Sequence, residues 1–250
     1  MDAQQLARQL SALEDLGLRT RRAAEALSAL EPRAAVTLLS DLLRAAGLRS
    51  APAASALEGV LRALRLELDE EARAGLRRAA EEATALEVLA LVSAAAATRS
   101  FDHDREQWVD REMRARTLGE RRSLARTRDR DLLTRLATDQ DAVVVKHILM
   151  NPRCTEREVL LAASRRPQRP EVLEEIFRSR RWSVNRSVRR ALALNPYSPP
   201  ALASAALALL TAPDLREVAR NLTLCPEVRV QARRLLGNRS GPRDAASGDA

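Results

Sequence analysis

Few residues of this chain have side chains suited to acid–base or metal chemistry. It contains only two histidines, His103 and His147. Asp102 and Asp104 flank His103, but adjacent residues of a helix or turn point in different directions and do not converge on one metal or substrate. His147 lies beside Lys146 in an apolar run, which is more typical of a histidine at the edge of a core than of a general base. We therefore predict no catalytic residue and no metal ligand.

The remaining candidate groups are thiols and paired carboxylates. Cys154 and Cys225 stand 71 residues apart with no Cys-x-x-Cys spacing, so we expect them to be reduced and incidental. Carboxylate pairs such as Glu156 and Glu158 occur among many arginines, where solvated ion pairs are the usual outcome. The sequence also lacks a Gly-x-Ser-x-Gly elbow, a phosphate-binding glycine loop and a His-Glu-x-x-His motif. These absences predict a protein that is not an enzyme and binds no cofactor.

Composition predicts the elements that position these residues. Hydrophobic residues make up 46% of the chain and are mostly Ala and Leu, whereas there are 8 glycines and only five aromatic residues. Ala and Leu favour helices, and a sheet would need more β-branched and aromatic side chains. We predict an all-α fold.

The first 98 residues are predicted to form an Ala-rich region of about six helices. Pro32 suits the first turn of a helix that stops at Gly47, and Ser50 precedes the next helix. Asp69 is a candidate N-cap for a helix through 83, and Thr84 for a helix through 98. The regularly spaced leucines from Leu6 to Leu16 indicate a single first helix, with apolar faces that pack in a core.

The second half contains an internal repeat. Asn151-Pro152 recurs as Asn195-Pro196 and, more weakly, as Asn238, at spacings of 44 and 43 residues. Repeats of the HEAT or armadillo kind need about 40–47 residues. Asn before Pro also ends helices, because Pro disfavours the α region at the preceding residue. The pattern predicts a right-handed α-solenoid of about three HEAT-like helical hairpins, in which the Asn-Pro pairs have a structural role.

These patterns predict four segments along the chain. They are an Ala-rich helical bundle or additional repeats over 1–98, a charged connector over 99–116, a HEAT-like repeat domain over 117–238, and a disordered tail over 239–250. The longest uncharged apolar run, near 88–98, is shorter than the roughly 20 residues that span a bilayer. Residues 1–30 lack the features of an export signal. We therefore expect a cytoplasmic protein without a transmembrane segment.

Residues about 117–236 resemble an uncharacterised bacterial family of HEAT-like or leucine-rich-repeat-variant α-solenoid proteins. The resemblance rests on three segments in order, Leu118-Gly119-Glu120-Arg121, Asn151-Pro152-Arg153-Cys154-Thr155-Glu156 and Asn195-Pro196-Tyr197-Ser198-Pro199. It implies a fold and little about function. Some variant-repeat proteins carry an iron–sulfur cluster on four cysteines, and this chain has two, so the resemblance implies no cluster.

Positive charge is concentrated in the second part of the chain. The net charge is +8, and residues 101–250 carry 29 Lys or Arg against 20 acids, with a single lysine at 146. Arginines cluster near the predicted turns together with one Trp, and on a solenoid such groups fall on one face. The candidate interaction surface comprises Arg165, Arg166, Arg169, Arg180, Arg181, Trp182, Arg186, Arg189 and Arg190.

Two functions fit this surface. The first is a non-catalytic scaffold that presents the solenoid to a protein partner. The alternative is a nucleic-acid binder whose arginines follow a phosphate backbone while Trp182 stacks on a base. Trp182 would instead pack between repeats if the arginines only cover the surface with their aliphatic stems. A more distant alternative is a HEAT-like DNA glycosylase or another repeat-fold enzyme. The sequence leaves the oligomeric state open.

Overall fold

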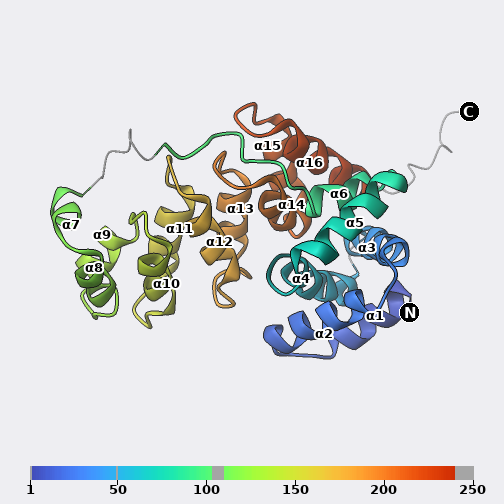
Figure 1. Cartoon of the computed structure of the whole chain (residues 1–250), viewed down its shortest axis with the longest axis horizontal. Helices are drawn as coiled ribbons and strands as arrows, with labels where there is room; N and C mark the ends of the chain where they lie inside the picture. The colour runs from blue at the N-terminus through green and yellow to red at the C-terminus, as the bar shows by residue number, and fades with distance from the viewer. Residues whose placement is uncertain (1, 49, 103–109, 240–250) are drawn as a thin grey trace, which may run out of the picture. The chain divides into compact units, whose positions relative to one another are not determined.

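The computed structural model describes residues 2–48, 50–102 and 110–239. In these ranges the chain forms 16 helices and no strand (Figure 1). The all-α prediction is confirmed. None of the helices in the described part of the chain is both long enough and apolar enough to cross a membrane.

The chain divides into two compact units. Unit 1 comprises 1–94, 208–221 and 226–250, and unit 2 comprises 95–207 and 222–225. This division differs from the predicted one, because two helices expected at the end of the repeat domain belong with the N-terminal helices. Of the predicted connector, residues 103–109 lie outside the described residues, and so does the predicted tail beyond Arg239.

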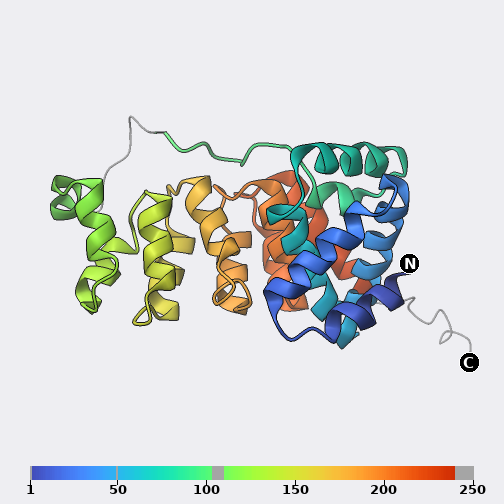
Figure 2. The ribbon, with the colours of Figure 1, turned by 60° about the horizontal axis from the view of Figure 1, so that its bottom comes forward.

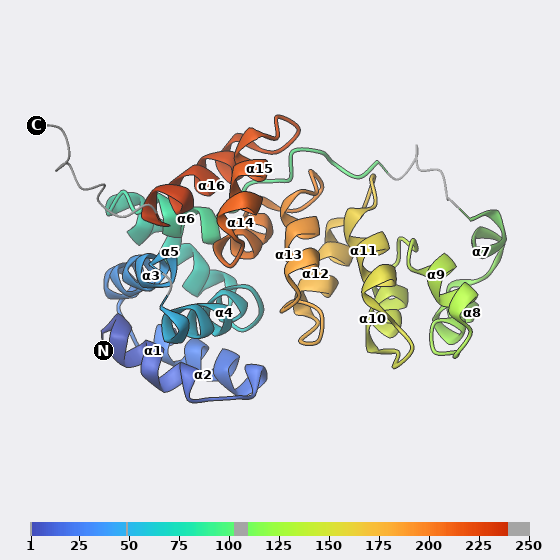
Figure 3. The same cartoon turned by 180° about the vertical axis from the view of Figure 1, so that it is seen from behind.

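Unit 1 is a bundle of eight helices within the described residues. Helix α4 packs against α1, α2 and α3, α3 also packs against α5, and α16 packs against α15, α6 and α3 (Figure 3). The helices of unit 1 are α1 (Ala3–Ser11), α2 (Leu16–Ser28), α3 (Pro32–Gly47), α4 (Ala51–Leu66), α5 (Glu70–Glu82), α6 (Leu86–Leu91), α15 (Ala212–Arg220) and α16 (Pro226–Arg239).

Side-chain caps begin several of these helices where the sequence predicts. The Ser50 hydroxyl accepts from the N–H of Ala53, and the Asp69 carboxylate accepts from the N–H of Ala72. The prediction of one first helix through Leu16 is wrong, because α1 ends at Ser11 and the Asp15 carboxylate caps α2. A carboxylate that binds the free N–H groups of a helix start stabilises a new helix over a continued one.

Thr84 is not the N-cap that the sequence predicts. It has a φ of 52° and follows the end of α5, where its N–H donates to Glu81 O and the N–H of Ala85 donates to Ala80 O. These two bonds are those of a Schellman C-terminal cap, a position that Gly usually occupies. Helix α6 therefore starts at Leu86, and it ends at Leu91 instead of near residue 98.

Gly59 allows α2 and α4 to approach closely. A Cβ at Gly59 would lie 2.7 Å from Arg19 Cγ and 3.3 Å from the Arg19 backbone carbon. The Arg19 side chain lies over this glycine, donates to Leu13 O at 2.6 Å and is 3.5 Å from the Glu58 carboxylate. A buried guanidinium is tolerated here because it has these partners.

Unit 2 consists of short helices that follow one another in chain order (Figures 1 and 2). Helices α8, α9 and α10 contact one another, α11, α12 and α13 contact one another in the same way, and α10 also packs on α12. The helices of unit 2 are α7 (Arg111–Ala115), α8 (Leu118–Leu124), α9 (Arg130–Leu136), α10 (Ala142–Met150), α11 (Glu156–Ser164), α12 (Pro170–Arg178), α13 (Arg186–Ala193) and α14 (Pro200–Ala208).

Three helices, not the predicted two, lie between Asn151 and Asn195. They fit in 44 residues because each has only eight or nine residues. Local caps define them: Thr155 and Glu158 form a capping box at α11, and the Asn185 side chain accepts from two N–H groups at the start of α13. The predicted hairpin is therefore replaced by a set of three helices.

The prediction that Asn238 is the third copy of the repeated Asn at a helix end is also wrong. Asn238 lies inside α16, whereas Asn221 occupies the end of α15, five positions before the start of the next helix at Pro226. Like Asn151, Asn221 has an extended backbone and donates its N–H to the residue three positions earlier, Val218 O. Asn221 therefore resembles Asn151 in local structure, at a shorter spacing from Asn195.

Candidate functional site

The turn after α10 is organised by the buried side chain of Asn151. Its Nδ2 donates to Ala125 O at 3.0 Å and Thr127 O at 2.7 Å, and its Oδ1 accepts from the N–H of Arg153 at 2.9 Å. The side chain thus links the end of α10 to the end of α8. The following Pro152 is exposed and makes the turn.

Asn195 has the same arrangement after α13. Its Nδ2 donates to Ala163 O and Arg165 O at the end of α11, and its Oδ1 accepts from the N–H of Tyr197. Here Pro196 is buried. Both asparagines therefore act as structural connectors, as the sequence predicts, and each satisfies backbone groups at a helix end.

Trp182 packs in the interior of unit 2 and is only 7% exposed. Its Nε1 donates to Leu149 O at 3.0 Å, which joins the α12–α13 loop to the end of α10. The Arg181 guanidinium covers the Trp182 ring at 4.4 Å and donates to Asn151 O and Cys154 O. Of the two interpretations of Trp182, packing within the protein agrees with the structure and stacking on a base does not, because the ring and its N–H are both in contact with other residues of unit 2.

Other arginines of the candidate interaction surface also bind the backbone of unit 2. Arg166 donates to Leu194 O at 2.6 Å, and Arg189 donates to Ser183 O at 2.6 Å. Arg169 lies over the ring of Phe101 and is 3.8 Å from Glu171. Arg165 is half-buried, and the remaining three, Arg180, Arg186 and Arg190, are exposed and each has a further interaction within the chain.

These contacts divide the predicted surface into two groups. Arg166, Arg181 and Arg189 satisfy carbonyl oxygens at helix ends and loops, as a positively charged donor does at the negative end of a helix. Their sequence clustering near turns has this local cause. Part of the predicted interaction surface therefore consists of arginines that hydrogen-bond to backbone carbonyls within unit 2.

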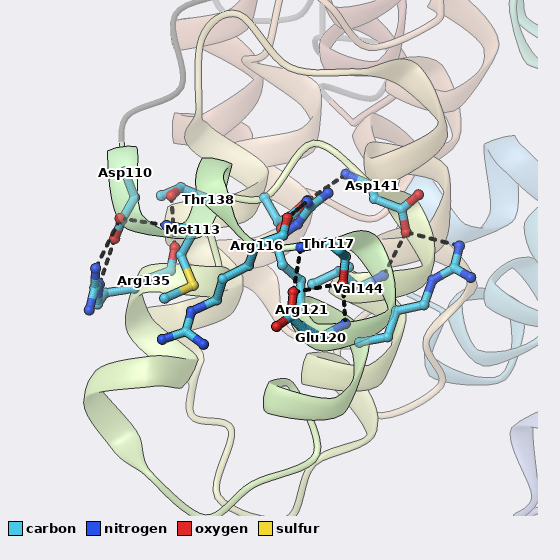
Figure 4. Close-up of polar contacts among 12 residues, drawn as sticks. Asp110, Met113, Arg116, Thr117, Glu120, Arg121, Arg135, Thr138, Asp141 and Val144 are labelled. Carbon is cyan, nitrogen blue, oxygen red and sulfur yellow. Dashed lines mark hydrogen bonds and ion pairs between the residues drawn. The ribbon is translucent and has the colours of Figure 1, made fainter.

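Two ion pairs fix the start of unit 2 (Figure 4). Arg135 binds Asp110 through two hydrogen bonds, and its guanidinium lowers the pKa of Asp110 to about 2. Arg121 donates from Nε to Asp139 at 2.8 Å, and both side chains are buried. Burial raises the pKa of Asp139, while Arg121 acts in the opposite direction.

A basic cluster forms where the C-terminal end of α8 meets α10, and the contact of its arginines with His147 was not predicted from the sequence. It consists of Arg122, Arg126, Lys146 and His147, and we call it the α8–α10 basic cluster. Arg126 donates to Nε2 of His147 at 2.9 Å. Burial, followed by Arg126, Arg122 and Lys146, lowers the pKa of His147. The two residues are 21 positions apart, so only the packing of α8 on α10 reveals the contact.

The second feature missed from the sequence is a shallow, wide-open groove on α11, which we call the α11 groove. Its volume is about 750 Å³ and its walls are mainly apolar, with Leu160 and Leu161 as the large apolar side chains. Leu161 is 37% exposed. Polar and charged side chains complete the lining: Thr138, Glu156, Arg157, Ser164 and Arg165.

Unit 1 has a comparable apolar groove between α5, α6 and α16. Its volume is about 510 Å³, and Leu86, Leu89 and Val230 contribute its large apolar side chains. Its rim holds two arginines and two glutamates, Arg77, Arg234, Glu81 and Glu227. Arg77 donates to Val92 O and pairs with Glu70, so part of this rim is bound within unit 1.

Cys154 and Glu158, two of the residues with potential for chemistry, are both buried. Cys154 is buried, and burial together with the Glu158 carboxylate raises the pKa of its thiol to about 12. The prediction of solvated ion pairs is wrong for Glu158, whose carboxylate is buried and accepts hydrogen bonds from Thr155 and Thr134. Across the described ranges, no three His, Cys, Asp or Glu side chains are grouped to hold a metal ion. His103, Asp104 and Trp108 lie outside these ranges.

Comparisons with protein-family models, with curated proteins and with solved structures find no significant match to this chain. The resemblance of residues 117–236 to HEAT-like and leucine-rich-repeat-variant proteins stays a prediction. Functional inference therefore rests on the grooves, charges and contacts described above.

Proposed function

We propose that the chain is a non-catalytic binding protein in which unit 2 is a segment of α-solenoid that presents the α11 groove to a protein partner. The repeated contacts within α8–α10 and within α11–α13 support the solenoid part of this proposal. Periods of about 40–47 residues with two or three helices are typical of HEAT and armadillo repeats. Solenoids of this type bind extended partners along the surface that successive repeats create.

The α11 groove is the observation that carries the binding proposal. Leu161 is exposed on the surface of a helix that already buries Val159, Ala162 and Ala163 on its inner face. Leu160 is partly exposed and Leu161 is exposed, so the outer face of α11 presents apolar surface in addition to the buried inner face. An apolar groove with a few polar groups at its edge is the usual form of a recognition site.

The lining of the groove indicates the chemistry of the partner. Leu160 and Leu161 would contact apolar side chains of a partner segment, whereas Glu156, Arg157 and Arg165 at the edge would pair with polar or charged groups. A segment with apolar residues on one face and charges of both signs on its flanks fits this arrangement. Most of the affinity would come from the buried centre, with the charges setting orientation.

The nucleic-acid alternative has less support. Trp182 is buried and its N–H is bound to Leu149 O, so it offers no stacking platform. Arg166 and Arg181 are occupied by backbone carbonyls. A phosphate-tracking surface needs a continuous series of available cations.

Affinity capture with the wild type and two matched variants tests the proposal. Full-length tagged wild type, Leu161→Arg and Leu222→Arg are used to recover partners from the cells that make the protein. Leu222 is also in unit 2 and is 77% exposed, so the same substitution there controls for a new surface arginine. We expect one protein recovered in comparable amounts by wild type and Leu222→Arg and lost with Leu161→Arg, with unchanged helical circular dichroism in all three.

Two results would contradict this proposal. If all three chains recover the same partner equally, the α11 groove is not the binding surface. A further variant, Leu86→Arg, alters the apolar groove of unit 1; if the partner is kept by Leu161→Arg and lost with Leu86→Arg, binding belongs to unit 1. Material released by nuclease treatment or by moderate salt would support the nucleic-acid alternative.

A further inference from the structure

The α8–α10 basic cluster has unused hydrogen-bonding capacity. Arg126 donates one hydrogen bond to His147, and neither Arg126 nor Lys146 forms an ion pair with any residue in the described ranges. The buried Nε–H of Arg122 has no acceptor among these residues, although its terminal nitrogen lies 3.6 Å from Asp141. Guanidinium groups in proteins usually pair with carboxylates; in this cluster Asp141 pairs with Arg122 alone, so Arg126 and Lys146 have no carboxylate partner in the described ranges.

The hydrogen bond between Arg126 and His147 defines the protonation state of the histidine. A guanidinium only donates, so Nε2 of His147 must accept and its proton must be on Nδ1. His147 is therefore neutral in this arrangement. An anion placed between the two side chains would bind Arg126 and, at the same time, stabilise the protonated imidazole.

We infer that Arg122, Arg126, Lys146 and His147 form a binding site for a single tetrahedral oxyanion of the phosphate class. Arg122 and Arg126 supply planar donors that match two oxygen atoms of such an anion, and Lys146 adds a compact charge. The site goes beyond the proposed partner groove and does not depend on it. The NMR titration below tests the anion site, whereas affinity capture tests partner binding at the α11 groove, so each proposal can be contradicted without the other.

The surroundings favour one anionic group over a polynucleotide. Arg135 is bound to Asp110 and Glu112, and Arg181 is bound to backbone carbonyls, so neither of these two arginines extends the cluster as an available cation. Asp141 is the acid that faces the cluster. Helices α9 and α12 also pack on α10. The charged side chains of α9 are Arg130, Asp131 and Arg135. Those of α12 are Glu171, Glu174, Glu175 and Arg178, and these four line a separate groove beside Ala142.

The imidazole of His147 reports anion binding directly. The experiment measures its pKa by proton NMR in the full chain with His103→Gln, which leaves one histidine signal. Sulfate serves as the first probe because its charge stays constant over the titration, and sodium chloride at equal ionic strength corrects for screening of the neighbouring cations. We expect sulfate to raise the pKa of His147 by about one unit relative to chloride, as an opposite charge in contact does.

Variants identify the residues that cause this shift. In Arg126→Gln, the difference between sulfate and chloride is expected to disappear, because the oxyanion loses a charged donor beside His147. Arg128→Gln changes an exposed arginine two positions away and should keep the difference. Lys146 is the only lysine of the chain, so a second signal comes from its isotopically methylated amine, which should shift with the same anion dependence.

The outcome distinguishes the possible sources of the anion. Inorganic phosphate, a phosphoserine peptide and a single-stranded oligonucleotide each compete with sulfate. Similar behaviour of free phosphate and phosphoserine supports a site for one phosphoryl group, and tighter binding of the peptide identifies a modified protein as the source. Equal His147 pKa values in sulfate and chloride would overturn the inference, as would an oligonucleotide that competes at far lower concentration than either phosphate.

Discussion

Asn151 and Asn195, which are 44 residues apart, make the same three hydrogen bonds with equivalent atoms. Each donates from Nδ2 to two carbonyl oxygens that belong to residues i and i+2 at the end of an earlier helix. Each accepts at Oδ1 from the N–H two positions further along the chain. The repeat seen in the sequence is therefore a repeat of a specific polar connection.

Replacing either asparagine should destabilise unit 2. Because one buried and two partly buried backbone hydrogen bonds are lost, we expect Asn151→Ala to lower the free energy of unfolding by about 2–3 kcal/mol, measured by urea denaturation. Asn151→Asp should be at least as harmful, since a carboxylate would face two carbonyl oxygens. The control is Asn238→Ala near the end of α16, where a change within about 0.5 kcal/mol is expected; equal effects at both positions would contradict the assigned role.

The Arg121–Asp139 ion pair should show strong coupling. Because each residue is buried with the other as its partner, Arg121→Met or Asp139→Asn alone should cost about 3–5 kcal/mol of stability by leaving an unpaired charge. The double variant should cost clearly less than the two single effects combined. A double-mutant cycle of urea unfolding measures this coupling, and additive effects would show that the two side chains do not depend on each other.

Thr84 offers a position at which stability should increase. Its φ of 52° places a β-branched residue in the left-handed region, which costs about 1–2 kcal/mol in an L-residue with a Cβ. Thr84→Gly should therefore raise the free energy of unfolding of unit 1 by about 1 kcal/mol, after allowance for the greater flexibility of Gly in the unfolded chain. Thr84→Ala keeps the Cβ and is the control; equal stabilities of the two variants would contradict this account.

The two thiols should differ sharply in reactivity. Cys154 is buried with a thiol pKa raised to about 12, whereas Cys225 is partly exposed. At pH 8 the thiolate fraction of Cys154 is on the order of one in ten thousand, so one thiol per native chain should react rapidly with a disulfide reagent. Cys225→Ser should remove that fast phase, and denaturation of this variant should make Cys154 reactive. Rapid reaction of Cys154 in the native chain would contradict the prediction and show that the turn after α10 opens readily.

Helix class and many helix starts followed from the sequence because their causes are local. Ser50 and Asp69 each cap a helix through atoms only a few residues away. The predictions at Asp15 and Thr84 are wrong because a residue type that caps helices can occupy more than one position. The Asp15 carboxylate starts a new helix within a run of regularly spaced leucines, and Thr84 follows the end of a helix although Thr more often precedes a helix start. The period of 44 residues was correctly identified, but it does not determine whether two or three helices fill it.

The binding features depended on contacts that a single sequence does not contain. Trp182 reaches Leu149 over 33 positions, and Arg126 reaches His147 over 21. Both pairs exist only because particular helices pack together. The sequence correctly indicated abundant arginine near the turns, but it did not distinguish the arginines that bind backbone carbonyls from those that face solvent.

Photo-crosslinking at the α11 groove tests the proposed function most directly. A photoreactive amino acid replaces Leu161 in one chain and Leu222 in another, and both are irradiated in the cells that make the protein. The account predicts a discrete protein adduct from position 161 that is absent from position 222, and that resists nuclease treatment. No adduct at 161, the same adducts at both positions, or an adduct that nuclease removes would contradict a protein partner in this groove.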